Sequence, residues 1–323
     1  MFPVGLEIIA IPAFILGIIL LYKGSDILVD GTVKIAVQLG ISALIISVLL
    51  VGFGTSAPEF AISVGAAAQN NPNSADISLG NIVGSCVANL LLVLGISAIV
   101  RPIKIKKGVI KREVPILLIA TLILLVFSYF SLLDDYHIYG GILFLIFFTL
   151  FIWFFIYCAK KERDLQKKYE TGDRRKNLLF IILGIAGVVI GAWLLIESST
   201  TIACLLGVPT FFIALSMVAI GTSLPELVVS AMAAYKNESD VAVGNVLGSN
   251  VFNILLILGA AALFIPLGAV ASFDHMIILL GVTVIIVPIL YTGHTISRVE
   301  GVGMLVLYSV FIWYIFFGRA MFF

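Results

Sequence analysis

The sequence predicts an all-α integral membrane protein of ten transmembrane helices, arranged as two inverted five-helix repeats. Three observations predict this fold class. The 323 residues are 61% hydrophobic and only 11% charged, the chain contains ten apolar stretches long enough to cross a bilayer, and two motifs each occur twice. Soluble domains carry about 25% charged residues, so this chain has too few charges to cover a surface that faces water.

The apolar stretches are the first of these observations to be placed along the chain. A helix that crosses a bilayer needs about 20 mostly apolar residues. The first stretch has no basic segment before it, so we expect a retained helix that continues to about Gln38 rather than a signal peptide. The ten expected spans cover approximately residues 3–22, 41–68, 78–100, 114–133, 138–158, 178–200, 208–234, 241–266, 275–292 and 300–318.

Basic residues predict how the spans are oriented, because loops rich in lysine and arginine stay in the cytoplasm. With ten spans, 18 of the 19 lysines and arginines fall on one side of the membrane, and only Arg319 does not. We therefore expect a multi-pass protein of the cell membrane with both termini extracellular and the central loop cytoplasmic. The expected organisation is a first five-helix repeat at 1–158, a cytoplasmic linker at 159–177 and a second, inverted five-helix repeat at 178–323.

Two motifs of the first half return in the second half. GFGTSAPEF at 52–60 recurs as AIGTSLPEL at 219–227, and GNIVGSCVANLLLVLG at 80–95 recurs as GNVLGSNVFNILLILG at 244–259, with ten of sixteen positions identical. The duplicated regions are thus 52–95 and 219–259. Because each half has an odd number of spans, the second half enters the membrane from the opposite side. Inverted repeats of this kind are typical of secondary transporters, whose substrate site forms near the membrane midplane.

The duplicated acids Glu59 and Glu226 both lie deep within expected spans. A carboxylate at such a position costs roughly 2.5 to 3.5 kcal/mol on insertion scales. No lysine or arginine lies in the middle of any span, so the sequence offers no basic partner for either acid. A bound cation or a proton remains as the compensating charge.

Each acid follows a proline, Pro58 or Pro225. A proline inside a helix removes one backbone hydrogen bond and kinks the helix, and carbonyls freed at a kink can bind hard cations. The backbone carbonyls expected near the kinks are those of Gly52, Thr55, Ala219 and Thr222, and the neighbouring hydroxyls are those of Ser56 and Ser223.

The second motif places neutral polar residues at intervals of four, on one face of each helix. Amide and hydroxyl oxygens suit Na⁺ and Ca²⁺, whereas the thiolates and imidazoles that softer metals prefer are missing from the set. We expect Asn81 and Asn245 to form hydrogen bonds between helices rather than to bind ions. The complete set is Asn81, Ser85 and Asn89 in the first half and Asn245, Ser249 and Asn253 in the second.

The two pairs of motifs resemble the α1 and α2 repeats of the sodium/calcium exchanger family, within the cation/calcium antiporter superfamily, and in particular its compact prokaryotic members. The resemblance implies antiport of Na⁺ against Ca²⁺ by alternating access, with about three Na⁺ per Ca²⁺ and hence one net charge moved per cycle. It also implies four cation sites between spans 2, 3, 7 and 8.

The resemblance assigns roles to individual residues. The implied Ca²⁺ ligands are Glu59 and Glu226 with the carbonyls of Thr55 and Thr222. The implied Na⁺ ligands are the same two acids with Ser56, Ser85, Ser223, Ser249 and the carbonyls of Gly52 and Ala219. Asn89 and Asn253 occupy the central polar positions.

One departure from the family bears on the choice of ion. Many relatives carry an acid where this chain has Asn253, so dependence on potassium is not expected here. A proton/calcium exchanger, or an exchanger of another divalent cation, remains the closest alternative, followed by a cation channel. Serine nucleophile, zinc hydrolase and P-loop motifs are missing, so no enzyme is expected. The expected partners are Ca²⁺, Na⁺ and the lipid bilayer, without a cofactor, a nucleic acid or a protein partner.

Overall fold

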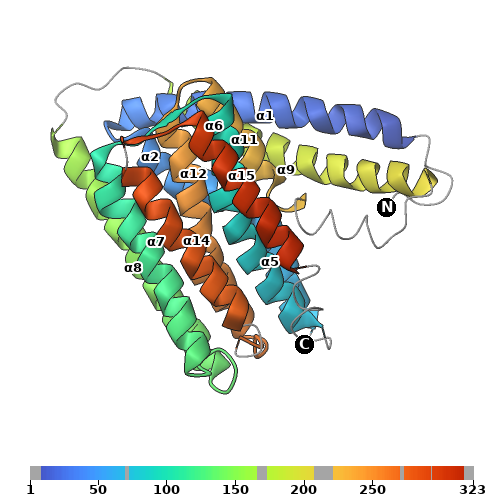
Figure 1. Ribbon diagram of the computed structural model, residues 1–323. Coiled ribbons are helices and arrows are strands. Elements are labelled where there is room, and N and C mark those ends of the chain that lie inside the picture. The colour runs from blue at the N-terminus through green and yellow to red at the C-terminus, as the bar shows by residue number, and fades with distance from the viewer. Residues whose placement is uncertain are drawn as a thin grey trace.

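The computed structural model describes residues 9–69, 73–165, 173–206, 221–269, 273–291 and 293–315, and this part of the chain is almost entirely helical (Figure 1). The elements, with η marking π-helical segments, are α1 (Ala10–Leu39), α2 (Ala43–Ile46), η2 (Ser47–Val51), α3 (Gly52–Thr55), α4 (Ala57–Gln69), α5 (Ser74–Ala88), η3 (Asn89–Val93), α6 (Leu94–Val100), β1 (Ile103–Lys104), α7 (Lys107–Tyr129), α8 (His137–Leu165), α9 (Arg174–Leu205), α11 (Leu224–Tyr235), α12 (Ser239–Val251), η5 (Phe252–Ile257), α13 (Leu258–Ala262), α14 (Phe273–Tyr291), β2 (Thr295–Ile296) and α15 (Arg298–Trp313).

The prediction of an all-helical, multi-pass membrane protein is confirmed. Within the described residues, seven helices are long and apolar enough to cross a membrane, and an eighth is added if the bent pair Ala43–Thr55 and Ala57–Gln69 is one span. Helix α11 has 12 residues and α15 has 16. The expected span 208–234 begins among residues that the structure does not describe, so the count of ten stays a prediction.

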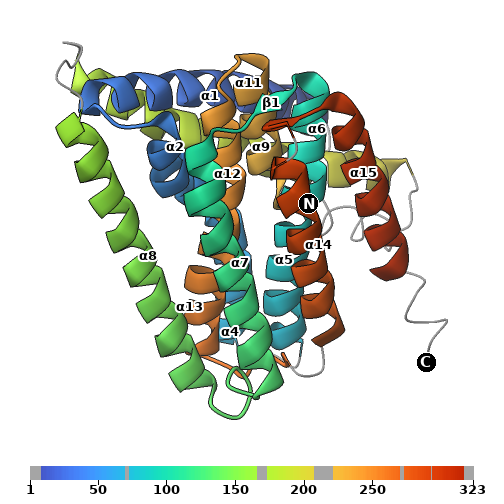
Figure 2. The same cartoon turned by 60° about the vertical axis from the view of Figure 1, so that its left-hand side comes forward.

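Helices α1 and α9 lie side by side and run across the other helices at a steep angle (Figures 1 and 2). A Cβ atom on Gly17 would lie 2.9 Å from the backbone nitrogen of Leu195, and one on Gly24 would lie 2.8 Å from that of Val188. Glycine at these positions therefore lets the two helices touch backbone to backbone. Helix α1 continues to Leu39, as the sequence predicts.

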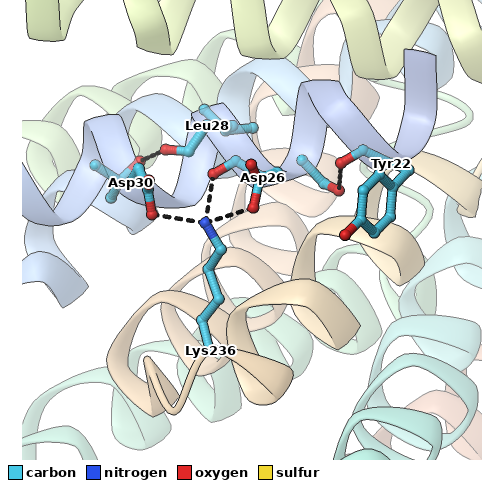
Figure 3. A network of polar contacts seen from close by, with 7 residues as sticks. Tyr22, Asp26, Leu28, Asp30 and Lys236 are labelled. Carbon is cyan, nitrogen blue, oxygen red and sulfur yellow. Dashed lines mark hydrogen bonds and ion pairs between the residues drawn. The ribbon is translucent and has the colours of Figure 1, made fainter. Parts of the chain in front are cut away.

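Three described loops that carry basic residues, those before α7, after α11 and before α15, meet at one end of the molecule. Strands β1 and β2 pair in antiparallel orientation, which joins the loop before α7 to the loop before α15. Arg101 Nη1 donates to the carbonyl of Tyr235 at 3.2 Å. Lys236 reaches Asp26 and Asp30 of α1 (Figure 3). The predicted grouping of these loops on one side of the membrane agrees with this arrangement.

The loop before α8 and the loop before α14 meet each other in the same way. The backbone nitrogen of Leu267 donates to the carbonyl of Leu133 at 3.0 Å, and that of Ala269 donates to Asp134 Oδ1 at 2.9 Å. Successive loops thus gather in two separate groups, which is the pattern of a chain that crosses the same layer repeatedly.

The two helices that carry the second motif form the centre of the molecule. The most apolar part of the helical span Ser239–Ala262 has 94% of its residues buried, and that of Ser74–Val100 has 78%. The corresponding share for His137–Lys161 is only 17%. The central helices also contain the equivalent π-helical segments η3 and η5. Their neutral polar residues are therefore enclosed by protein rather than by lipid.

Candidate cation-binding site

Glu59 lies in the first turn of α4, directly after a break in the helix. Ser56 has backbone angles of φ −80° and ψ 7°, and the helical segments Ala43–Thr55 and Ala57–Gln69 meet there with a bend of 48°. Pro58 has no N–H group, so it fits the first turn of a new helix, where that group would lack an intrahelical acceptor. The predicted proline kink is thus a complete break, and the break places Glu59 at the positive end of the α4 dipole.

The second copy of the motif adopts the same local structure. Helix α11 begins at Leu224 after Ser223, whose angles are φ −85° and ψ 5°, and Pro225 lies in its first turn. Glu226 follows in that turn. Both Glu59 and Glu226 are completely buried, and the ion pairs formed among the described residues involve neither of them.

Hydrogen bonds between the two halves connect the acids in one network. Ser56 Oγ of the first half donates to Glu226 Oε1 of the second half at 3.1 Å. Ser85 Oγ donates to Glu59 Oε1 at 3.1 Å and lies 3.1 Å from Ser223 Oγ. Ser56 of the first motif thus bonds the acid of the second motif, and Ser223 of the second motif is linked to Glu59 through Ser85. The duplicated motifs therefore lie next to each other.

Ser249 and Gly52 complete the side of the network around Glu226. Ser249 Oγ lies 3.3 Å from the carbonyl oxygen of Gly52 and 3.4 Å from Glu226 Oε1. Thr55 Oγ1 lies 3.4 Å from Ser249 Oγ. A backbone carbonyl, two hydroxyls and a carboxylate thus converge at this point, which is a suitable set of oxygens for a hard cation.

Asn81 and Asn245 hold the motif helices together, as predicted. Asn245 Nδ2 donates to the carbonyl of Glu226 at 3.3 Å, and Asn81 Nδ2 lies 3.4 Å from that of Glu59. Each amide oxygen lies near a threonine hydroxyl of the other half: Thr55 Oγ1 is 3.0 Å from Asn245 Oδ1 and Thr222 Oγ1 is 3.4 Å from Asn81 Oδ1. The same amides donate to two serines that sequence reasoning missed, Ser63 and Ser230.

Four buried side-chain oxygens of the site have no hydrogen-bond partner among the described residues. They are Glu59 Oε2, Glu226 Oε2, Asn89 Oδ1 and Asn253 Oδ1. All four residues are completely buried. Buried acceptors are normally satisfied, and leaving a buried carboxylate oxygen without any partner is costly. A set of unpartnered oxygens, two of them on carboxylates, fits hard cations.

The residues that the sequence predicts as ligands lie close together in the structure, with one exception. Ala219 lies outside the described residues, while the other residues expected as ligands belong to the network or carry one of the four oxygens. No group of three or more His, Cys, Asp and Glu residues that could hold a metal ion is found in the described part of the chain. The oxygens of the site come instead from two carboxylates together with hydroxyl, amide and carbonyl groups, which suit hard cations. Asn250 was not predicted as a site residue, yet its Oδ1 accepts a hydrogen bond from Asn89 Nδ2 at 3.0 Å.

Comparisons with known proteins agree with this geometry. The family model described as "Sodium/calcium exchanger protein" matches residues 9–157 and 176–317. The "Sodium/calcium exchanger MaX1" of Methanosarcina acetivorans is 34% identical over 345 residues, which cover 94% of this chain and 97% of that protein. The "Inner membrane protein YrbG" of Escherichia coli is 30% identical and covers 95% of this chain and 96% of its own length.

Solved structures resemble the chain over a similar length. The sodium-calcium exchanger NCX_Mj soaked with 10 mM Na⁺ and zero Ca²⁺ superposes with a TM-score of 0.81 at 32% identity, over 94% of this chain and 98% of that one. The same exchanger soaked with 10 mM Na⁺ and 10 mM Sr²⁺ gives a TM-score of 0.80 at 33% identity. On the family match, the full-length relatives and the shared fold, the chain belongs to the sodium/calcium exchanger family and is a membrane transporter rather than an enzyme.

Proposed function

We propose that the protein is a secondary active antiporter that exchanges Na⁺ for Ca²⁺ across the membrane by alternating access. The observation that carries the proposal is the set of four buried oxygens on Glu59, Glu226, Asn89 and Asn253 to which no described residue forms a hydrogen bond. The two carboxylates together carry about the charge that balances one Ca²⁺. Na⁺ ions use the same carboxylates, so they bind only when Ca²⁺ has left. Competition for shared ligands is the coupling device.

The ligand assignments follow the family resemblance. Ca²⁺ is held by Glu59, Glu226 and the carbonyls of Thr55 and Thr222. Na⁺ is held by the two acids, the four serines of the motifs and the carbonyls of Gly52 and Ala219. The serine network across the halves supports these assignments, because Ser56 and Ser249 contact the carboxylate of Glu226 and Ser85 contacts that of Glu59. Ser223 lies next to Ser85.

Alternating access follows from charge. Two ionised carboxylates cannot pass through a closed apolar barrier without a large penalty, so the protein changes its facing only when cations neutralise them. The helix pair α1 and α9, which are expected spans one and six, forms the sliding gate, and the four motif spans form the fixed core. The backbone contact of α1 with α9 at Gly17 and Gly24 supports movement of the two helices as one unit.

The topology belongs to the same proposal. The chain has ten spans in two inverted five-helix repeats, with both termini outside the cell and the loop between α8 and α9 in the cytoplasm. The meeting of the loops that carry Arg101 and Lys236 supports this topology, because cytoplasmic loops are rich in basic residues.

The test measures uptake of ⁴⁵Ca²⁺ into reconstituted vesicles loaded with Na⁺. Wild type accumulates Ca²⁺ when Na⁺ leaves, and Glu59→Gln or Glu226→Gln reduces the initial rate at least about 100-fold, because a neutral amide lowers the site's charge where no water screens it. Asp135→Asn is the matched control, since Asp135 is an exposed acid of a loop. Uptake retained in both glutamine variants would remove these acids from the site.

The alternative functions are separated in the same vesicles. Two buried acids without a basic partner also suit an exchanger of protons for Ca²⁺. In that case a pH gradient drives uptake when Na⁺ is replaced by an impermeant cation. Uptake that needs no counter-ion gradient at all would indicate a channel.

A further inference from the structure

Asn250 and Cys86 occupy equivalent positions of the duplicated motif, in GSN and GSC, where α12 crosses α5. Asn250 Nδ2 donates to the carbonyl of Cys86 at 3.1 Å, and Cys86 Sγ lies 3.9 Å from the carbonyl of Asn250. Both residues are completely buried. The two halves thus differ at their crossing point, since one contributes an amide and the other a thiol.

The Asn250 amide can be oriented in only one way. A backbone carbonyl only accepts, so the NH₂ group of Asn250 must face Cys86 and its Oδ1 must face Asn89. Asn89 Nδ2 therefore donates to Asn250 Oδ1, at 3.0 Å. This bond turns Asn89 Oδ1 to the opposite side of the amide, where no described residue donates to it.

The equivalent amide of the second half is held differently. Asn253 Nδ2 lies 3.3 Å from Ser85 Oγ. Ser85 also bonds Glu59 Oε1 and lies next to Ser223 Oγ. Asn253 thus interacts with a hydroxyl of the ion site and with the Cys86 side chain, whereas Asn89 is held by Asn250.

We propose that Asn250 is a positioning residue that fixes the Asn89 carbonyl oxygen toward the central cation. The proposal rests on the proposed function, because it requires a hard cation between the two acids. Without Asn250, the Asn89 amide can turn and present its NH₂ group, which repels a cation. Partners of this kind typically contribute about ten-fold or more to metal affinity.

The test uses Asn250→Cys, which places at position 250 the residue that the first half already carries at position 86. The half-saturating Ca²⁺ concentration for uptake should rise about ten-fold, while the maximal rate changes little, because a ligand oxygen used throughout binding is lost. In an Asn89→Ser background, Asn250→Cys should cause no further rise, since Asn250 acts through Asn89. Val243→Ala, two turns away in α12, controls for lost packing and should leave the half-saturating concentration unchanged.

Each outcome decides the proposal. An unchanged half-saturating concentration in Asn250→Cys overturns it, and so does a rise of equal size in the Asn89→Ser background. If wild type shows no Na⁺-driven uptake, the proposed function fails separately. The role of Asn250 is then tested in detergent by thermal unfolding at increasing Ca²⁺ concentrations. The Ca²⁺ concentration that gives half of the maximal stabilisation should be about ten-fold higher for Asn250→Cys than for wild type. An unchanged concentration would refute the proposal.

Discussion

Replacing Lys236 with methionine tests how α1 is fastened to the rest of the protein. Lys236 follows the last residue of α11, and its Nζ lies 2.7 Å from Asp26 Oδ1, 2.6 Å from Asp30 Oδ1 and 3.0 Å from the carbonyl of Asp26 (Figure 3). One ammonium group thus bonds two acids one turn apart on α1. Methionine keeps the length of the side chain and removes all three contacts.

The size of the effect follows from the exposure of the three side chains. They are 20%, 34% and 46% exposed for Lys236, Asp26 and Asp30, so solvent weakens both ion pairs. An exposed pair contributes about 0.2–1 kcal/mol, and charge-assisted bonds in partly buried positions lie at the upper end. We therefore expect Lys236→Met to lower the free energy of unfolding by about 1–2 kcal/mol.

The pH dependence of this contribution has a defined sign. Burial alone lowers the pKa of Lys236, but the hydrogen bonds and charges of Asp26 and Asp30 outweigh burial and raise that pKa above its usual value of 10.5. The stabilisation is complete below the pKa of the unfolded chain and is lost only as the pH rises through the higher folded value. Between pH 6 and pH 9 the effect of Lys236→Met should therefore be constant.

The assay is thermal unfolding of the purified protein in detergent. Lys236→Met should lower the midpoint by about 2–4 °C, whereas Lys23→Met, which removes an exposed lysine of α1, should have little effect. In an Asp26→Asn, Asp30→Asn background, Lys236→Met should have little further effect. An equal loss in both backgrounds would refute the ion-pair explanation.

Two further predictions concern packing and charge outside the ion site. Gly24→Ala should destabilise the protein by about 1–3 kcal/mol, because the added Cβ would lie 2.8 Å from the backbone nitrogen of Val188. The control is Gly303→Ala, whose Cβ would have no described atom within 4 Å. In the same thermal assay this control should be neutral or slightly stabilising. Burial and then the charge of Asp240 raise the pKa of Glu238 above its usual 4.5. The free energy of unfolding therefore falls as the pH rises from 4.5 through the higher pKa of the folded state. Glu238→Gln should remove that fall, which is worth a few tenths of a kcal/mol because Glu238 is only partly buried.

The duplicated motifs made the centre of the site predictable. Because the same local chemistry occurs twice, the sequence indicated that Glu59 and Glu226 lie at equivalent places, and the proline before each acid indicated an interrupted helix. The serine bonds between the halves agree with that prediction. The interrupted helices depend on residues within ten positions of each acid, which is the range over which local sequence determines backbone structure, whereas the meeting of the two halves was inferred from the repeat itself.

Features that depend on tertiary contact could not be predicted. The role of Asn250 arises where α12 crosses α5, and periodicity within one helix does not give that crossing. Asn89, expected on the same helical face as Asn81 and Ser85, begins the π-helical segment η3 and bonds Asn250 of α12, a contact that spacing along one helix does not give. The acids that bind Lys236 lie more than 200 positions before it in the sequence. Its position in a loop therefore indicated on which side of the membrane that loop lies, but not which residues Lys236 contacts.

The distribution of hydrogen bonds indicates which parts of the protein can move against each other. The two halves of the core share buried bonds such as those of Ser56 with Glu226 and of Asn250 with Asn89. Leaving a buried polar group without its partner costs about 1–3 kcal/mol, so separating the halves would break several such bonds at once. Helix α1 touches α9 through glycines and is joined to the loop after α11 by the partly exposed contacts of Lys236. In the proposed transport cycle, movement of α1 and α9 together past an intact core would exchange apolar contacts and release a tether of about 1–2 kcal/mol, which thermal motion and ion binding can supply.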